Sequence, residues 1–188
     1  TLDWCSFVDA AGQLAVALQG MGLQPGDRVG LWLARSPTWP LACAACWRLG
    51  VAFVPLDRTA PVARIAEVLQ DAGIRCVISD NAQAWPLAGD DCRVLYWQGA
   101  GDALVTTASI TAPASMPLPS ADAPAYVIYT SGSSGRPKGV QILQRNLLAY
   151  SDGLESQCRQ PAASVATLAP YTFDASIYEL ASALLHGR

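Results

Sequence analysis

Charged residues are scarce in this sequence of 188 residues. Asp, Glu, Lys and Arg together make up 14% of the chain, against about a quarter in a typical soluble domain. The net charge is only −3 and no basic stripe is present, which argues against nucleic acid as a partner. Because hydrophobic residues reach 52%, we expect part of the surface to be covered by protein outside this chain.

Long apolar segments are also missing. Every apolar run falls well short of the roughly 20 residues that a transmembrane helix needs, and no signal peptide opens the chain. The sequence therefore predicts no membrane association and a soluble protein of the cytoplasm.

The chain has six cysteines but a single histidine, His186, which limits the zinc sites that the cysteines could complete. Cys43 and Cys46 have the spacing of a zinc or redox pair, but zinc needs four ligands and the histidine is distant in sequence. The surrounding "LACAACW" is typical of an apolar helix face, so we predict buried, reduced thiols. A redox pair is the less favoured alternative, and no metal ligand is assigned.

Hydrophobic periodicity along the first hundred residues alternates between helix and strand. A three- to four-residue period predicts helices, and short apolar runs bounded by Gly or Pro predict buried strands. The predicted helices cover 3–19, 36–49 and 59–72, and the predicted strands cover 29–34, 52–56, 76–79 and 93–97. This alternation predicts an α/β fold, with parallel-rich sheets flanked by helices.

The pattern divides the chain into three regions. Residues 1–98 form a first α/β region, 99–124 an Ala/Pro/Ser-rich connection, and 125–188 a second α/β region. In the last region we predict two strands, a helix capped by Asn146, a strand over 165–169 and a helix over 173–185. We expect the strands from Ala125 onwards to begin a second sheet, and the chain to be the N-terminal portion of a longer domain.

The segment "YTSGSSGRPKGV" (129–140) lies between two of these strands. A flexible linker is the alternative, but ordered strands on both sides favour a tight return loop. Its glycines allow positive φ, its amides and hydroxyls offer donors, and its lysine adds a charge suited to phosphate. Pro137 before the lysine, and a following strand, exclude the common nucleotide P-loop. The residues predicted to bind phosphate are Thr130, Ser131, Gly132, Ser133, Ser134, Gly135, Lys138 and Gly139.

Three segments together resemble the adenylate-forming, AMP-binding enzymes. The 129–140 loop resembles their signature loop, "GVAFVPLDRTAPVARIAEVLQDAG" (50–73) resembles a peptide-synthetase segment, and "FDASIYEL" (173–180) resembles F-D-x-S-V-x-E-[IL]. Within the group, the resemblance is closest to adenylation domains of nonribosomal peptide synthetases. It implies ATP- and Mg²⁺-dependent activation of an amino acid as its adenylate, with pyrophosphate release. The product would pass to a phosphopantetheinyl carrier domain of the same synthetase, sometimes with a small accessory protein.

The resemblance also assigns roles to individual residues. Asp174 would bind the α-ammonium of the amino acid, with Phe173, Ala175 and Tyr178 lining one side of the pocket. Lys138 would hold the leaving pyrophosphate. The principal catalytic lysine and the Mg²⁺ ligands are expected outside this chain, so no catalytic residue is assigned within it.

Each of these roles has a simpler structural alternative. Asp174 would serve as a helix N-cap, Lys138 as a solvated lysine, and Phe173 and Tyr178 as core aromatics. Ser176 and Glu179 have the spacing of a capping box, which would leave Asp174 free for a ligand.

Two other functions remain open. One is an acyl- or aryl-CoA ligase, which would not need an acid for an ammonium group. The other is a noncatalytic or interrupted adenylation domain that only binds nucleotide or a partner.

Overall fold

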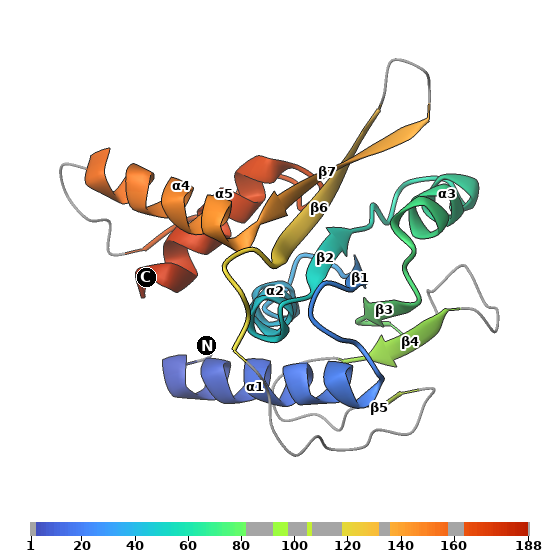
Figure 1. Ribbon diagram of the computed structural model, residues 1–188, viewed down its shortest axis with the longest axis horizontal. Coiled ribbons are helices and arrows are strands. Elements are labelled where there is room, and N and C mark those ends of the chain that lie inside the picture. The colour runs from blue at the N-terminus through green and yellow to red at the C-terminus, as the bar shows by residue number, and fades with distance from the viewer. Residues whose placement is uncertain are drawn as a thin grey trace.

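The computed structural model describes residues 3–81, 92–97, 105–106, 118–131, 136–157 and 164–187. These residues form a seven-stranded sheet with helices on both of its faces (Figure 1). The helices are α1 (Trp4–Gly20), α2 (Thr38–Leu49), α3 (Val62–Ala72), α4 (Gln144–Gln157) and α5 (Asp174–Leu185). The strands are β1 (Arg28–Trp32), β2 (Ala52–Pro55), β3 (Cys76–Ser79), β4 (Arg93–Tyr96), β5 (Val105–Thr106), β6 (Pro124–Ser131) and β7 (Pro137–Leu143).

Local sequence signals set most of the helix ends. Asp3 caps α1, where its carboxylate accepts a hydrogen bond of 2.9 Å from the Ser6 amide. Helices α2 and α3 each end at a glycine in the left-handed region, Gly50 with φ 74° and Gly73 with φ 63°. The predicted helix boundaries in the first hundred residues therefore agree closely with the structure.

The strand order is β5-β4-β3-β1-β2-β6-β7. The pairs β1–β2, β1–β3, β3–β4 and β2–β6 are parallel, whereas β4–β5 and β6–β7 are antiparallel. The α/β class with a parallel-rich sheet is confirmed. The expectation of a second sheet from Ala125 onwards is wrong, because β6 lies beside β2 and extends the same sheet, with Phe53 opposite Tyr126.

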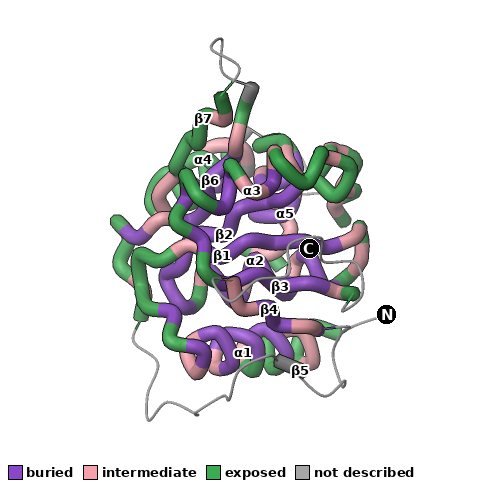
Figure 2. Tube along the Cα trace, turned by 90° about the vertical axis from the view of Figure 1, so that its right-hand side faces the viewer, coloured by how far each residue is buried: buried purple, intermediate pink, exposed green. Residues whose placement is uncertain are grey.

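Apolar side chains on both faces of the sheet form the core. One face packs against α2, on which α1 lies, and the other packs against α3 (Figure 1). Figure 2 shows the buried positions concentrated along the central strands and the inner sides of α1 and α2. This two-sided burial explains the unbroken apolar runs that the sequence shows at β1, β2 and β3.

Gly30 in β1 marks the tightest packing on the α3 side. A Cβ atom at this position would lie 2.9 Å from Leu56 Cδ1 and 3.0 Å from Val77 Cγ2. Only glycine allows both side chains to approach the strand this closely.

The structure differs from the prediction at residues 165–169, which form no strand. The backbone carbonyls of residues 167–169 accept hydrogen bonds from the Arg35 guanidinium, and the amides of residues 168 and 169 donate to Glu179. Side chains therefore take the partners that a neighbouring strand would otherwise supply. Helix α4 also begins earlier than predicted, at Gln144, so Asn146 lies inside it; its Oδ1 accepts from the Leu143 amide at 3.3 Å.

The prediction that the C-x-x-C thiols are buried and reduced is confirmed. Cys43 and Cys46 are free, fully buried residues of α2. Burial raises the pKa of both thiols well above the usual value, and raises the pKa of Cys76 to about 12. Because the thiolate is the reactive form, these three side chains should be inert in the native protein.

We therefore expect Cys5, which is exposed, to react with a disulfide reagent at neutral pH while Cys43, Cys46 and Cys76 stay unmodified. Mass spectrometry of peptides after a short labelling pulse measures each site separately. In denaturant all four should react. Rapid native labelling of Cys43 or Cys46 would contradict the packing of α2 against the sheet.

Of the helices in the described ranges, none combines the length and the apolar character that crossing a bilayer requires.

Candidate functional site

The β6–β7 hairpin carries the segment predicted to bind phosphate. The two strands pair antiparallel, with Tyr129 opposite Gly139 and Thr130 opposite Lys138. The expected return between two sheet strands is thus confirmed. Gly132, Ser133, Ser134 and Gly135 lie outside the described residues, as does the side chain of Ser131.

Thr130, Lys138 and Gly139 lie at the end of the hairpin strands next to this loop. The Thr130 hydroxyl donates to the Lys138 carbonyl at 3.4 Å, and the Lys138 side chain is exposed. A Cβ atom at Gly139 would lie 3.0 Å from the Tyr129 ring, so glycine leaves room for that ring on the opposite strand.

Helix α3 supports the hairpin near its loop end. The Tyr129 hydroxyl donates to Asp71 Oδ2 at 2.5 Å, and burial together with this carboxylate raises the pKa of Tyr129. Arg64 Nη2 lies 3.5 Å from the Thr130 carbonyl oxygen. The direction of the hairpin relative to the sheet is therefore set in part by α3.

A pocket of about 820 Å³ lies between α3, the β6–β7 hairpin and the beginning of α5. Its volume falls in the range usual for small-molecule sites. Four residues predicted for the site line it: Thr130 from β6, and Phe173, Asp174 and Tyr178 from the segment that starts α5. Lys138 and Ala175 are not among its lining residues. The structure thus brings the hairpin and the "FDAS" segment, more than 40 positions apart in sequence, to one cavity.

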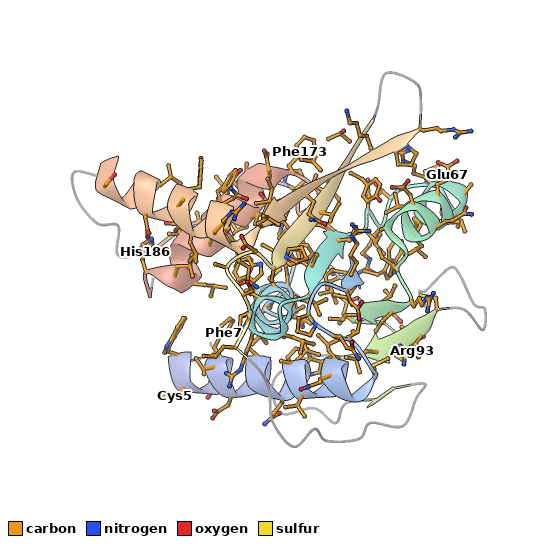
Figure 3. All side chains as sticks on the ribbon, in the orientation of Figure 1. Cys5, Phe7, Glu67, Arg93, Phe173 and His186 are labelled. Carbon is orange, nitrogen blue, oxygen red and sulfur yellow. The ribbon has the colours of Figure 1, made fainter. Side chains whose placement is uncertain are left out.

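Asp174 is the first residue of α5 and is exposed. Its Oδ1 accepts a 2.8 Å hydrogen bond from the next amide, Ala175. A negative charge at the start of a helix is stabilised by the helix dipole. The hydrogen bond with the Ala175 amide uses only one of the two carboxylate oxygens. Phe173 precedes Asp174 and is 61% exposed; Figure 3 labels this ring beside the hairpin.

The predicted capping box at Ser176 and Glu179 does not form. The Ser176 hydroxyl donates to the Phe173 carbonyl at 2.7 Å. Glu179 instead accepts from the amides of Leu168 and Ala169. Ser176 therefore does not cap α5, so the capping box cannot be the reason that Asp174 is free. The position of Asp174 follows instead from the path of the chain before α5.

A tyrosine cluster that sequence reasoning missed lies behind Asp174. Tyr150 and Tyr178 stack with ring centroids 3.9 Å apart. Tyr126 is 1% exposed, and its hydroxyl makes no hydrogen bond of ordinary geometry although the Tyr178 hydroxyl is near. Burial, then Tyr178 and Asp174, raise the pKa of Tyr126, so this phenol is neutral at physiological pH. No periodic signal marks Tyr126, since it reads as an ordinary strand residue.

Within the described ranges, no cluster of three or more His, Cys, Asp or Glu side chains could hold a metal ion. The polar side chains that line the pocket include Arg64, Thr130 and two carboxylates, Asp57 and Asp174. Arginine and hydroxyl groups suit anionic phosphate oxygens, and carboxylates suit an ammonium group.

The sequence matches a family profile and several known proteins. Residues 1–188 match the family profile described as AMP-binding enzyme. The chain is 32% identical to L-proline--[L-prolyl-carrier protein] ligase of Pseudomonas fluorescens, over 92% of this chain and 36% of that protein. It is 33% identical to gramicidin S synthase 2 of Aneurinibacillus migulanus, over 100% of this chain and 4% of that protein. The chain therefore spans well under half the length of these relatives.

Solved structures show the same arrangement. The Klebsiella oxytoca NpsA N-terminal subdomain, in complex with 3-hydroxyanthranilyl-AMSN, is 30% identical with a TM-score of 0.74, and the match covers 96% of this chain and 44% of that one. CmiS6 is 26% identical with a TM-score of 0.78, over 96% of this chain and 42% of that one.

Proposed function

The chain belongs to the AMP-binding enzyme family, and from this premise we propose that it forms the N-terminal part of a domain that activates an amino acid. The proposed reaction joins the amino acid carboxylate to the α-phosphorus of ATP and releases pyrophosphate. The observation that carries the proposal is the single cavity of about 820 Å³ shared by Asp174, Phe173 and Tyr178 on one side and Thr130 on the other.

Asp174 is proposed to bind the substrate ammonium group. It lies at the wall of the pocket, its carboxylate is only partly occupied by the Ala175 amide, and no described cation forms an ion pair with it. A carboxylate facing an ammonium group in a cavity makes a strong charge-assisted hydrogen bond. Phe173 and Tyr178 would flank the substrate; Ala175, which is not a lining residue of the pocket, would contribute only by its small size.

The hairpin is proposed to hold the ATP phosphates. Thr130 and Ser131, the segment Gly132–Gly135, and Lys138 with Gly139 would offer hydroxyl, amide and ammonium donors. Donors fixed in place stabilise the charge that grows on the departing diphosphate more than they stabilise the ground state. Bound Mg²⁺ would neutralise phosphate charge, with ligands that we expect beyond this chain.

A carrier domain is the proposed acceptor of the activated amino acid, with the rest of a synthetase as neighbour and a small accessory protein as a further candidate partner. The support comes from relatives: gramicidin S synthase 2, and NpsA-ThdA, an artificially fused adenylation-PCP di-domain.

ATP–pyrophosphate exchange with the natural full-length protein tests the proposal. We expect exchange to depend on one or a few amino acids when the tested panel also includes aryl and fatty acids. Exchange that follows plain carboxylates would favour the second candidate, an aryl- or acyl-activating ligase, for which the NpsA complex with 3-hydroxybenzoyl-AMSN is the supporting observation. Absence of exchange with every acid of the panel would favour a noncatalytic domain.

Replacing Lys138 with alanine is expected to raise the apparent KM for ATP by about tenfold, because a charged hydrogen bond contributes on the order of 1.5–3 kcal/mol. Exchange kinetics at saturating amino acid measure the effect. Lys138→Arg should retain much of the affinity, since the charge remains. Arg136→Ala, which removes an exposed cation from the same hairpin, is the matched control, and an equal effect there would argue for a nonspecific loss of positive charge.

A further inference from the structure

Residues 167–171, which precede α5, are held by a single arginine from another part of the fold. Arg35 lies between β1 and α2. Its Nη1 donates to the Thr167 carbonyl at 2.6 Å, and its Nη2 donates to the carbonyls of Leu168 and Ala169 at 3.3 and 2.7 Å. Three consecutive carbonyl groups, 132 to 134 positions away in sequence, thus share one guanidinium.

The same segment is bound from α5 itself. Glu179 Oε2 accepts hydrogen bonds from the Leu168 and Ala169 amides at 3.0 and 3.4 Å. At these two residues, carbonyl and amide are therefore both bonded to charged side chains on different elements. Hydrogen bonds to charged groups are stronger than those between neutral groups, so the segment has little freedom to shift.

An aromatic stack joins this arrangement to the core. The Tyr171 ring contacts both Arg35, whose guanidinium carbon is 5.1 Å from the ring centroid, and Trp39 of α2, whose ring is stacked at 4.0 Å and 8°. Trp39 is 2% exposed. The stack holds residues 167–171 against α2, a helix that packs on the sheet.

The path from this stack to the pocket is short. The Phe173 amide donates to the Pro170 carbonyl at 2.9 Å, which closes a turn, and α5 begins at the next residue, Asp174. Thr172, Phe173 and Asp174 all line the pocket. A displacement of residues 167–171 would therefore move these three residues directly.

We propose that Arg35 is a positioning residue for the substrate pocket, which fixes Asp174 and Phe173 through the backbone of residues 167–169 and the ring of Tyr171. The inference rests on the proposed function, in which Asp174 binds the amino acid. Arg35 does not line the pocket and is not a catalytic residue. Its planar, multidentate guanidinium is required, because a lysine ammonium is a point charge that neither spans three carbonyls nor stacks flat on a ring.

The test uses three variants of the natural full-length protein: Arg35→Ala, Arg35→Lys and, as a matched control, Arg75→Ala, which removes an exposed arginine. Exchange kinetics are measured separately against amino acid and against ATP. We expect Arg35→Ala to raise the amino acid KM by about tenfold, because small misplacements of binding groups cost on the order of tenfold to 100-fold. The ATP KM should stay unchanged, since the hairpin is supported by α3, and Arg35→Lys should give a smaller rise.

A second readout, deuterium uptake of the peptide that contains residues 164–174, does not depend on activity. Uptake should quicken in Arg35→Ala and not in Arg75→Ala. Unchanged uptake, an unchanged amino acid KM, or an equal rise of both KM values would overturn the positioning role; Arg35→Lys serves the same comparisons if the alanine variant does not fold. No amino-acid-dependent exchange in the unmodified protein would overturn the proposed function instead, and uptake would still decide whether Arg35 orders the segment.

Discussion

Replacing Asp174 with alanine is expected to reduce amino-acid-dependent pyrophosphate exchange by about 100-fold. Hydrogen bonds to charged groups contribute on the order of 1.5–3 kcal/mol, and each 1.4 kcal/mol corresponds to roughly a tenfold change. The effect should fall on the amino acid, because Asp174 lines the pocket from α5, whereas the hairpin proposed to bind phosphate lines it from β6 and β7. Kinetics at varied amino acid and fixed ATP measure it.

Two further variants separate charge from structure at this position. Asp174→Asn can keep the hydrogen bond to the Ala175 amide but loses the negative charge, so it should be nearly as impaired as the alanine variant. Asp152→Ala removes an exposed acid from α4 and should leave exchange unchanged. The helix dipole contribution of Asp174 is about 0.3–1 kcal/mol, too small to unfold the protein. Near-normal exchange in Asp174→Ala would refute the assignment.

The largest expected loss of stability follows from Phe53→Ala, which should lower the free energy of unfolding by about 3–5 kcal/mol. Phe53 in β2 is fully buried and contacts the rings of Trp39, Trp47 and Tyr126, with centroids 5.9, 5.9 and 5.8 Å away. It also pairs with Tyr126 where β2 meets β6. Its removal would leave a cavity where β2 meets β6.

Urea unfolding followed by tryptophan fluorescence measures this loss, because Trp39 and Trp47 lie beside the altered ring. Phe53→Leu retains most of the volume and should cost less than about 1.5 kcal/mol. Val62→Ala, at a position 46% exposed on α3, is a matched apolar truncation that should change little. Equal stability of Phe53→Ala and the unmodified protein would mean that this ring does not stabilise the junction of β2 and β6.

Local pattern predicted most of the elements because the forces that set them are local. The spacing of apolar residues in α1, the glycines that end α2 and α3, and the short apolar runs of β1 to β3 are each readable over a few positions. The hairpin was predictable for the same reason, since glycine and proline interrupt two runs of strand-forming residues. The order of the strands is a different matter, because the β2–β6 pairing joins residues that are more than 70 positions apart.

Residues 165–169 show why the remainder was not predictable. A short apolar segment is typical of a strand, but a strand also needs a neighbour, and here Arg35 and Glu179 take the backbone groups. No sequence rule links Arg35 to a backbone carbonyl so distant in the chain. Glu179 illustrates the same limit: its spacing from Ser176 suits a capping box, yet tertiary contacts with Leu168 and Ala169 prevail.

The candidate site also contains residues that the sequence predicted and residues that it did not. The resemblance named Asp174, Phe173 and Tyr178, and the structure places all three at one pocket with Thr130. The supporting residues Tyr126, Arg64 and Arg35 carried no signal, because a buried tyrosine, an arginine within a helix and an arginine before a helix are common in any α/β domain. Their roles depend on distances that only the fold creates.

The strand order ends at β7, whose middle positions are exposed. Within the part of the chain that the structure describes, this terminal strand of seven residues has a neighbouring strand on one edge only, and its other edge is a template for strand addition from another molecule. We therefore expect this chain, when it is produced by itself, to associate through β7. Its aggregation should increase with protein concentration. A lysine or proline substituted at Gln141, midway along that strand, should improve its yield as a monomer.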